Sequence, residues 1–360
     1  MVSKPKGDQM RRIALAAVCC SVVWWSGQSR ASAQPAGWTG PLVVVIGIDG
    51  LSIDGVERAK DPQLHRMMEQ SAWTLQARGV MPTLSSPNWE SAITGAGPEQ
   101  HGITSNGILG KMSKFEPVCK DAEGHFPTIF EILRTQHPTA DIAVFHEWPG
   151  FADLLEKSVP NVLQHGGSHE KITAGAMEYW KAHHPALLFV HLDIVDHTGH
   201  DSGWGTAAYL KAVAEADKDV GELLDMVKQD PNAGRTYVLL TSDHGGKNRN
   251  HGGNSIVEIT IPWMIAGPDI VPGQIQSPVY IYDTAATIAW IFSLNTPDCW
   301  IGRPAIAAFR SSAISARNGL RTNTSSPGCE PAQRPAIAVA PASAPSSAAT
   351  NLLGPGHSKE

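Results

Sequence analysis

The chain has 360 residues, a hydrophobic fraction of 42% and a formal net charge of −6 at pH 7. Its ends are basic, with +4 over residues 1–33 and +2 over residues 311–360, which leaves −12 for residues 34–310. The excess of acidic residues over 34–310 argues against nucleic-acid binding as the main role. An anionic substrate would need local positive charge, such as that of a bound metal ion.

The two ends of the chain differ in composition from the part between them. Basic residues near the N-terminus precede an apolar run, Ile13 to Trp25, and the small-x-small pattern Ala31-Ser32-Ala33. This order predicts a signal peptide over residues 1–33, and hence a periplasmic or secreted protein. The run is shorter than the roughly 20 residues of a spanning helix, so no transmembrane segment is expected after cleavage. Residues 311–360 are rich in Ala, Ser and Pro, which predicts a disordered tail.

Residues 34–310 remain as one expected folded domain of α/β class. The mature chain keeps three widely spaced cysteines, Cys119, Cys299 and Cys329. One disulfide among them is expected in an oxidising compartment, and the sequence leaves the pair open.

Apolar β-branched runs alternate with segments of helical period along this body. In chain order the expected elements are strand 41–50, helix 56–70, strand 73–80, helix 87–94, helix 127–136, strand 141–145, helix 170–183, strand 186–192, helix 206–227, strand 236–240, strand 262–266 and helix 284–291. This alternation predicts a doubly wound, mostly parallel central sheet flanked by helices. Residues 106–125 have no clean period, and fit either a loop over the site or a solvated insertion.

The stretch from Met81 to Ile103 predicts a loop that enters a helix. Ser86 is placed to cap the helix and Pro87 to occupy its first position. A serine just before such a helix faces unpaired backbone N–H groups and the positive end of the helix dipole, which suits a phosphate or sulfate group. The alternative is an ordinary capped surface helix.

Three predicted strands end in metal-ligating side chains. Asp49 ends the first, Asp196 and His200 follow a later one, and Asp243 and His244 end a third; His251 follows in a glycine-rich loop. Each cluster alone fits a turn or cap, but the carboxyl ends of parallel strands share one edge of a sheet. Carboxylates with imidazoles suit Zn²⁺ best, Mn²⁺ next and Ca²⁺ poorly. Six ligands and a serine oxygen are too many for one tetrahedral ion and suit two.

At this point the chain resembles the alkaline phosphatase superfamily, and within it the nucleotide pyrophosphatase/phosphodiesterase-like branch. The motifs that carry the resemblance are GIDG (47–50), PTLSSPN (82–88), TGAGPEQHGI (94–103), DHTGH (196–200), SDHGG (242–246) and HGG (251–253). The resemblance implies an alkaline phosphatase-like fold with two metals. Asp49, Asp243 and His244 would hold one, with the nucleophile as a further ligand. The other would be held by Asp196, His200 and His251.

The resemblance also assigns the nucleophile and the phosphate contacts. Ser85 lies two positions before the Pro-Asn pair, where the branch has its attacking hydroxyl, and Ser86 is the alternative. Asn88 would donate its amide to a phosphate oxygen. Asn106 and Lys247 are further candidate substrate contacts, or else residues of solvated loops.

His101 and His197 fall on no ligand position of the resembled branch. A structural or solvent-facing role is expected for both.

The expected activity is that of a secreted two-metal phosphohydrolase that acts on a small, nucleotide-like phosphorylated substrate through a Ser85 phospho-enzyme. No arginine lies between Val80 and Gly110, where monoesterases of the superfamily bring one to the phosphate, which favours diesters or pyrophosphates. A phosphomonoesterase or phosphonate hydrolase is the alternative. A Cys/Ser-x-Pro-x-Arg motif is missing, which disfavours a sulfatase. The alternative from another class is a non-catalytic binding protein, and the sequence does not indicate an oligomeric state.

Overall fold

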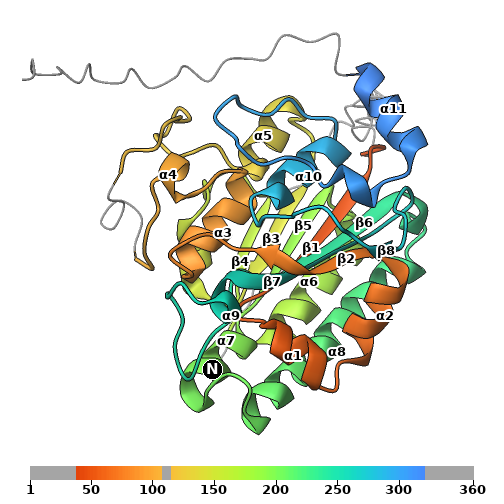
Figure 1. The fold of residues 1–360 in the computed structure, drawn as a ribbon. Helices are drawn as coiled ribbons and strands as arrows, with labels where there is room; N and C mark the ends of the chain where they lie inside the picture. The colour runs from red at the N-terminus through yellow and green to blue at the C-terminus, as the bar shows by residue number, and fades with distance from the viewer. Residues whose placement is uncertain (1–37, 108–114, 321–360) are drawn as a thin grey trace, which may run out of the picture. The chain divides into compact units, whose positions relative to one another are not determined.

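A mixed eight-stranded sheet forms the centre of the protein. The structure is a computed structural model that describes residues 38–107 and 115–320 (Figure 1). The strand order is β4-β3-β5-β1-β6-β7-β2-β8. Strand β7 runs antiparallel to its neighbours β6 and β2, and the other neighbouring pairs are parallel. The predicted α/β class with a mostly parallel sheet is therefore confirmed.

The strands follow the apolar runs of the sequence closely. Their bounds are β1 Leu42–Ile48, β2 Ala72–Arg78, β3 Ile142–His146, β4 Val162–His165, β5 Leu187–Leu192, β6 Thr236–Thr241, β7 Thr260–Ala266 and β8 Gly273–Gln274. Strands β1, β5 and β6 are buried along their whole length, as expected of central parallel strands covered on both faces.

Helices lie on both faces of the sheet (Figure 1). Their bounds are α1 Ile53–Arg58, α2 Pro62–Gln70, α3 Ser85–Thr94, α4 Pro98–His101, α5 Ile129–Gln136, α6 His169–His183, α7 Ile194–Ser202, α8 Ala207–Gln229, α9 Ile256–Ile259, α10 Asp283–Ile291 and α11 Ser311–Leu320, with short 3₁₀ turns η1 Pro149–Asp153, η2 Ala233–Arg235 and η3 Ile306–Ala308.

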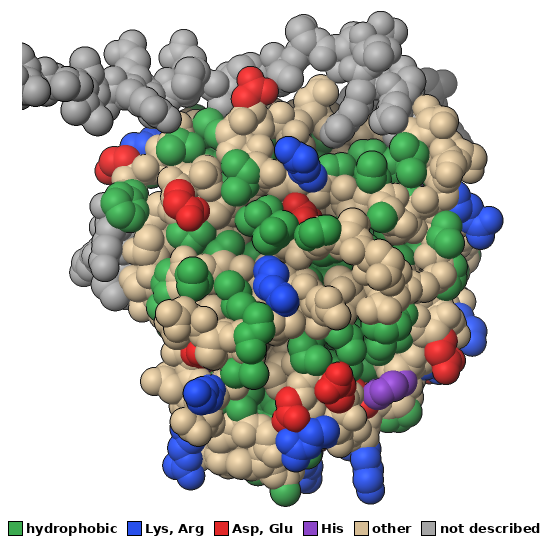
Figure 2. Space-filling view, viewed as in Figure 1, with side chains coloured by type: hydrophobic (Ala, Val, Ile, Leu, Met, Phe, Trp, Pro, Cys, Tyr) green, Lys and Arg blue, Asp and Glu red, His purple; other side chains and the backbone are tan. Residues whose placement is uncertain are grey.

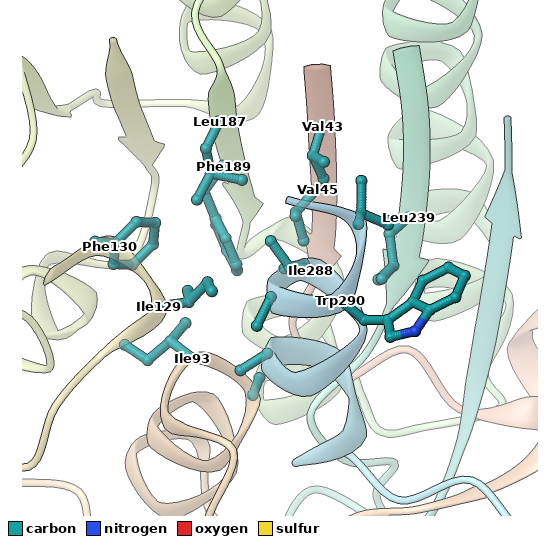
Figure 3. Close-up of a cluster of buried hydrophobic side chains, with 14 of the residues drawn as sticks. Val43, Val45, Ile93, Ile129, Phe130, Leu187, Phe189, Leu239, Ile288 and Trp290 are labelled. Atoms are coloured by element: carbon teal, nitrogen blue, oxygen red, sulfur yellow. The ribbon is translucent and has the colours of Figure 1, made fainter. Parts of the chain in front are cut away.

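The alternation of side chains along β1 divides the core into two layers. Val43 and Val45 pack with residues of α3, α5 and α10, including Ile93, Ile129 and Ile288 (Figure 3). Residues of opposite parity on β1 pack instead against α2, α6 and α8. Helix α3, which carries the serine pair, is thus anchored in the first layer, with its start at the edge where β1, β5 and β6 end.

Three predicted boundaries are wrong. The helix expected over 56–70 is two helices, because Pro62 begins α2 after a break. Helix α3 begins at Ser85 and its N-cap is Leu84, so Ser86 is not the cap and Pro87 is the third helical residue. Helix α11 lies in the segment expected to be disordered, and its first turns pack against the core at Ala313 and Ile314.

Cys119 pairs with Cys299, which resolves the pair that the sequence left open. Cys329, the predicted signal peptide and the rest of the predicted tail lie outside the described residues. Among the described helices, none is both long and apolar enough to cross a bilayer. On the face shown in Figure 2, the described Lys and Arg side chains are scattered among acidic ones and form no continuous basic surface.

Candidate metal centre and nucleophile

The first predicted triad, Asp49, Asp243 and His244, comes together where β1 and β6 end. These strands are parallel neighbours, so the residues that follow them lie side by side. The Nε2 atom of His244 lies 3.5 Å from Asp49 Oδ1 and 3.1 Å from Asp243 Oδ2. One ligand atom from each residue lies within 4.8 Å of the others, a spacing that one ion can bridge.

The second predicted triad is built from α7 and a loop. Asp196 and His200 lie one helical turn apart on α7, with His200 Nε2 3.4 Å from Asp196 Oδ2. His251 comes from the connection between β6 and β7. Its Nε2 lies 3.0 Å from His200 Nε2 and 3.6 Å from Asp196 Oδ1. All six predicted ligands therefore gather into two groups at one edge of the sheet.

Each imidazole of the two triads is oriented by a backbone carbonyl. The Nδ1 atoms of His244, His200 and His251 lie 2.8–3.0 Å from the carbonyl oxygens of Gly245, Arg249 and Thr83. A carbonyl only accepts, so each Nδ1 carries the proton and each Nε2 presents a lone pair. Two such lone pairs 3.0 Å apart repel unless a positive charge lies between them. This tautomer is also the one that metal-ligating histidines adopt.

Each carboxylate of the triads has a buried oxygen without a hydrogen-bond partner. These atoms are Asp49 Oδ1, Asp196 Oδ1 and Asp243 Oδ2. A buried unpaired carboxylate oxygen is costly, and coordination to a cation removes that cost. The oxygens and the imidazole lone pairs together fit divalent ions of the kind that the ligand chemistry predicts.

The site's electrostatics also favour bound cations. Burial and then the charge of Asp49 raise the pKa values of Asp196 and Asp243 well above the ordinary value. Burial also raises the pKa of Asp49, but the hydrogen bonds from His191 and Trp89 and the neighbouring imidazoles outweigh it and bring that pKa to about 2. Burial lowers the pKa of His244 to about 3, so its ring is neutral, as a ligand requires.

Two aromatic residues that the sequence did not single out hold Asp49 in place. Trp89 on α3 donates from Nε1 to Asp49 Oδ2 at 2.8 Å, and His191 Nε2 lies 3.2 Å from the same oxygen. Both are fully buried, so Asp49 Oδ2 is engaged and Oδ1 faces the triad. His191 lies within an expected buried strand, and Trp89 belongs to no motif that the sequence analysis used.

Gly50 allows the two triads to approach each other. Its φ is +68°, and a Cβ there would lie 2.8 Å from the Cα of Asp196. Only glycine fits both the left-handed backbone and this close approach. Asp193, a further carboxylate not predicted from sequence, lies close to Asp49 and Asp196.

Ser85 is the first residue of α3 and faces the first triad. Its Oγ lies 3.2 Å from His244 Nε2, and the residue is buried. The next residue, Ser86, donates its backbone N–H to Asn106 Oδ1 at 2.8 Å. The exposed Asn106 is thereby fixed beside the serine pair, although it lies 20 residues further along the chain.

The predicted phosphate contact of Asn88 is wrong. Its side chain is fully buried and bonded to the loop before α3. Oδ1 accepts from the N–H of Val80 at 2.7 Å, and Nδ2 donates to the carbonyls of Pro82 and Leu84 at 3.2 and 2.9 Å. The amide has no donor left for a substrate, and its role is to shape the entry of the chain into α3.

The other candidates are placed as follows. His101 is buried against Ser91 and has a structural role, and His197 is exposed beside Asp201, as expected for both. Exposed Lys247 lines a cavity of about 460 Å³ with Trp204 and other residues next to the site.

Comparison with known proteins agrees with this geometry. Residues 43–259 match the family model "Type I phosphodiesterase / nucleotide pyrophosphatase". Ectonucleotide pyrophosphatase/phosphodiesterase family member 3 of Rattus norvegicus is 25% identical over 244 residues, which is 63% of this chain and 28% of that protein. Family member 1 of Homo sapiens is 26% identical over 229 residues, covering 59% and 24%. The chain thus spans about a quarter of the length of these curated relatives.

Solved structures share the fold. Murine ectonucleotide pyrophosphatase/phosphodiesterase 5, in an inactive form in complex with AMP, has a TM-score of 0.60 at 17% identity, covering 71% of this chain and 96% of that one. The human protein of the same name has a TM-score of 0.62 at 15% identity, covering 75% and 100%. The family match extends over more than half of the chain and includes every predicted metal ligand. The chain therefore belongs to the type I phosphodiesterase/nucleotide pyrophosphatase family.

Proposed function

We propose that this protein is a two-metal hydrolase of phosphodiester or pyrophosphate bonds in small, nucleotide-like substrates. Zn²⁺ is the preferred ion and Mn²⁺ the alternative. The observation that carries the proposal is the position of Ser85 Oγ, 3.2 Å from the ligating nitrogen of His244 and at the start of α3. The AMP complex of the murine structural neighbour is in keeping with a nucleotide-like substrate.

The two triads would hold the ions, Asp49, Asp243 and His244 one, and Asp196, His200 and His251 the other. When bound, such ions supply Lewis acidity at phosphate oxygens and lower the pKa of an oxygen ligand. Ser85 gives up its hydroxyl proton to solvent and attacks phosphorus in line as the bond to the leaving oxygen breaks. The phosphoryl group, still carrying its other substituent, is transferred to Oγ, and the leaving oxygen takes up a proton from solvent. Water then cleaves the serine ester and restores the hydroxyl.

Asn106 takes the role that Asn88 cannot fill. Because its Oδ1 is held by the N–H of Ser86, its Nδ2 group is left to donate to a non-bridging phosphate oxygen next to Ser85. The backbone N–H groups in the first turn of α3 add positive potential at the same place. These donors stabilise the charge that develops on the phosphoryl oxygens in the transition state.

The preference for diesters rests on the missing arginine. Arg78, which ends β2, is held by the Thr260 hydroxyl and by backbone carbonyls, and no other arginine follows it before Gly107. Without a cation for the second charge of a monoester, a singly charged diester is the better substrate. A periplasmic or secreted location is supported by the N-terminal sequence pattern and by the Cys119–Cys299 disulfide.

The test is the Ser85→Ala variant, assayed with bis(p-nitrophenyl) phosphate and p-nitrophenyl phosphate. We expect kcat to fall by about 10³-fold or more, since loss of a covalent nucleophile has at least that effect. Metal content should stay near two ions per chain, because Ser85 is one ligand among several.

Ser86→Ala is the matched control and should keep most of the activity. An unchanged rate in Ser85→Ala would remove the nucleophile assignment. A wild-type protein with fewer than about one ion per chain and no hydrolysis of either ester would favour a binding protein on this fold.

A further inference from the structure

A second group of metal-ligating side chains lies outside the catalytic site. Asp121, His125 and Glu156, here called the Asp121 cluster, each offer one ligand atom, and these atoms lie within 4.8 Å of one another. Asp121 and His125 belong to the segment before α5, and Glu156 follows η1. None of the three was singled out by the sequence motifs.

The cluster contains polar atoms that are buried without partners. Glu156 is 1% exposed; its Oε2 accepts from the Thr128 hydroxyl at 2.7 Å, and its Oε1 has no hydrogen-bond partner. His125 Nδ1 is likewise buried and unpartnered, 3.7 Å from Asp121 Oδ2. A buried carboxylate oxygen and an imidazole nitrogen, both without hydrogen-bond partners, point to a missing cation between them.

The backbone holds Asp121 in a ligating orientation. Its Oδ1 accepts the N–H groups of Glu123 and His125, each at 2.8 Å, and its own N–H donates to the carbonyl of His125 at 2.8 Å. These bonds close the turn that brings the two side chains together, and they leave Oδ2 directed towards His125.

The carboxylates in and near the cluster have no lysine or arginine partner in the described part of the chain. Glu90 on α3 is 5% exposed, its Oε2 is buried without a partner, and it lines a cavity of about 350 Å³ together with His125. Among the described residues, no Lys or Arg forms an ion pair with Glu90, Asp121 or Glu156.

We propose that the Asp121 cluster is a third, non-catalytic metal site, in which Asp121, His125 and Glu156 bind one divalent first-row ion. Two carboxylates and an imidazole suit Zn²⁺ or Mn²⁺. Such an ion fixes residues 121–125 against the start of α5 and the segment that follows η1. Glu90 lies five residues after Ser85 on α3, about 7.5 Å along the helix axis, so the ion stabilises the same helix that presents the nucleophile.

The first experiment counts metal ions by mass spectrometry after dialysis against Zn²⁺. The double variant Asp121→Asn/Glu156→Gln should contain about one ion per chain fewer than the wild type. His125→Gln, a milder change at a half-exposed side chain, should show the same loss. The control Asp153→Asn removes a nearby surface carboxylate that pairs with Lys157 and should lose none.

Equal metal content in the wild type, the double variant and His125→Gln would overturn the proposal. The comparison is independent of the catalytic ions, because the expected difference is one ion whatever the total.

The second experiment compares the Tm of Glu156→Gln with that of the wild type at pH 7.5, in EDTA and in Zn²⁺. In EDTA the variant should be at least as stable, because it lacks a buried negative charge. In Zn²⁺ it should be less stable, because it has lost a ligand. If the wild type and the variant rank in the same order of Tm in EDTA and in Zn²⁺, the proposed site is contradicted.

Discussion

The contact between Trp89 and Asp49 gives a quantitative prediction about metal binding. The Trp89→Phe substitution removes the indole N–H that donates to Asp49 Oδ2 at 2.8 Å. A hydrogen bond to a charged acceptor contributes about 1.5–3 kcal/mol, so Asp49 becomes less well oriented and its pKa rises. Changes to residues that orient metal ligands typically weaken metal affinity 10–100-fold. We expect that loss in zinc affinity and a parallel loss in kcat/KM at limiting zinc.

Trp180→Phe is the matched control. Trp180 is also fully buried and donates from Nε1 to a carboxylate, Asp230 Oδ2, at the same 2.8 Å, but it lies in the other core layer on α6. Both variants lose a charge-assisted bond and part of an indole ring, so both should lose about 2–4 kcal/mol of unfolding free energy.

Zinc affinity, measured by competition with a chromogenic chelator, should separate the two variants. An affinity unchanged in Trp89→Phe, or reduced equally in both, would refute the role of Trp89 in orienting Asp49.

Three further predictions concern other parts of the protein. Asn106→Ala should lower kcat/KM on the diester by about 10²–10³-fold with little change in Tm, and an unchanged rate would exclude a phosphate contact. Burial raises the pKa of Asp61 to about 6, above its unfolded value of 3.8, so the wild type loses stability as pH rises from about 4 to about 6. Asp61→Asn should therefore gain roughly 1–2 kcal/mol in urea unfolding at pH 7.5 and nothing at pH 4, and an equal gain at both would contradict the titration. The double variant Cys119→Ser/Cys299→Ser loses a link across 180 residues and should be less stable by up to about 5 kcal/mol in calorimetry, a loss that dithiothreitol reproduces in the wild type.

The sheet and the gathering of the six proposed metal ligands at one edge were predictable from the sequence for one physical reason. A strand buried on both faces must be a continuous apolar run, so the aspartates that end such runs, Asp49 and Asp243, mark the edge of the sheet directly. Asp196 lies instead in the first turn of α7, just after β5, and its four-residue spacing to His200 is the spacing of one helical turn.

The residues that surround the ligands were not predictable in this way. His191 looks like a core residue because its neighbours in β5 are apolar, and no motif marks Trp89 among its polar neighbours in α3. The partner of both, Asp49, is distant in the chain. Asn88 was misread for a related reason. An asparagine near a helix start can bond forward to a ligand or backward to its own loop, and only the loop's path decides between them.

The antiparallel direction of β7 affects how the site can vary between proteins. The connection from β6 to β7 leaves and re-enters the sheet at the same edge, and its ends are fixed by neighbouring strands. Within this connection, His251 is positioned by the contact of its Nδ1 with the carbonyl oxygen of Thr83, at the entrance to α3. The residues between His244 and His251 are fixed as well, because the Arg249 carbonyl orients His200 and the Asn248 carbonyl accepts the N–H of Trp204. A change in the number of residues between these two proposed histidine ligands would therefore displace His200 along with His251, so this stretch is as sensitive to length as the loop from 79 to 84.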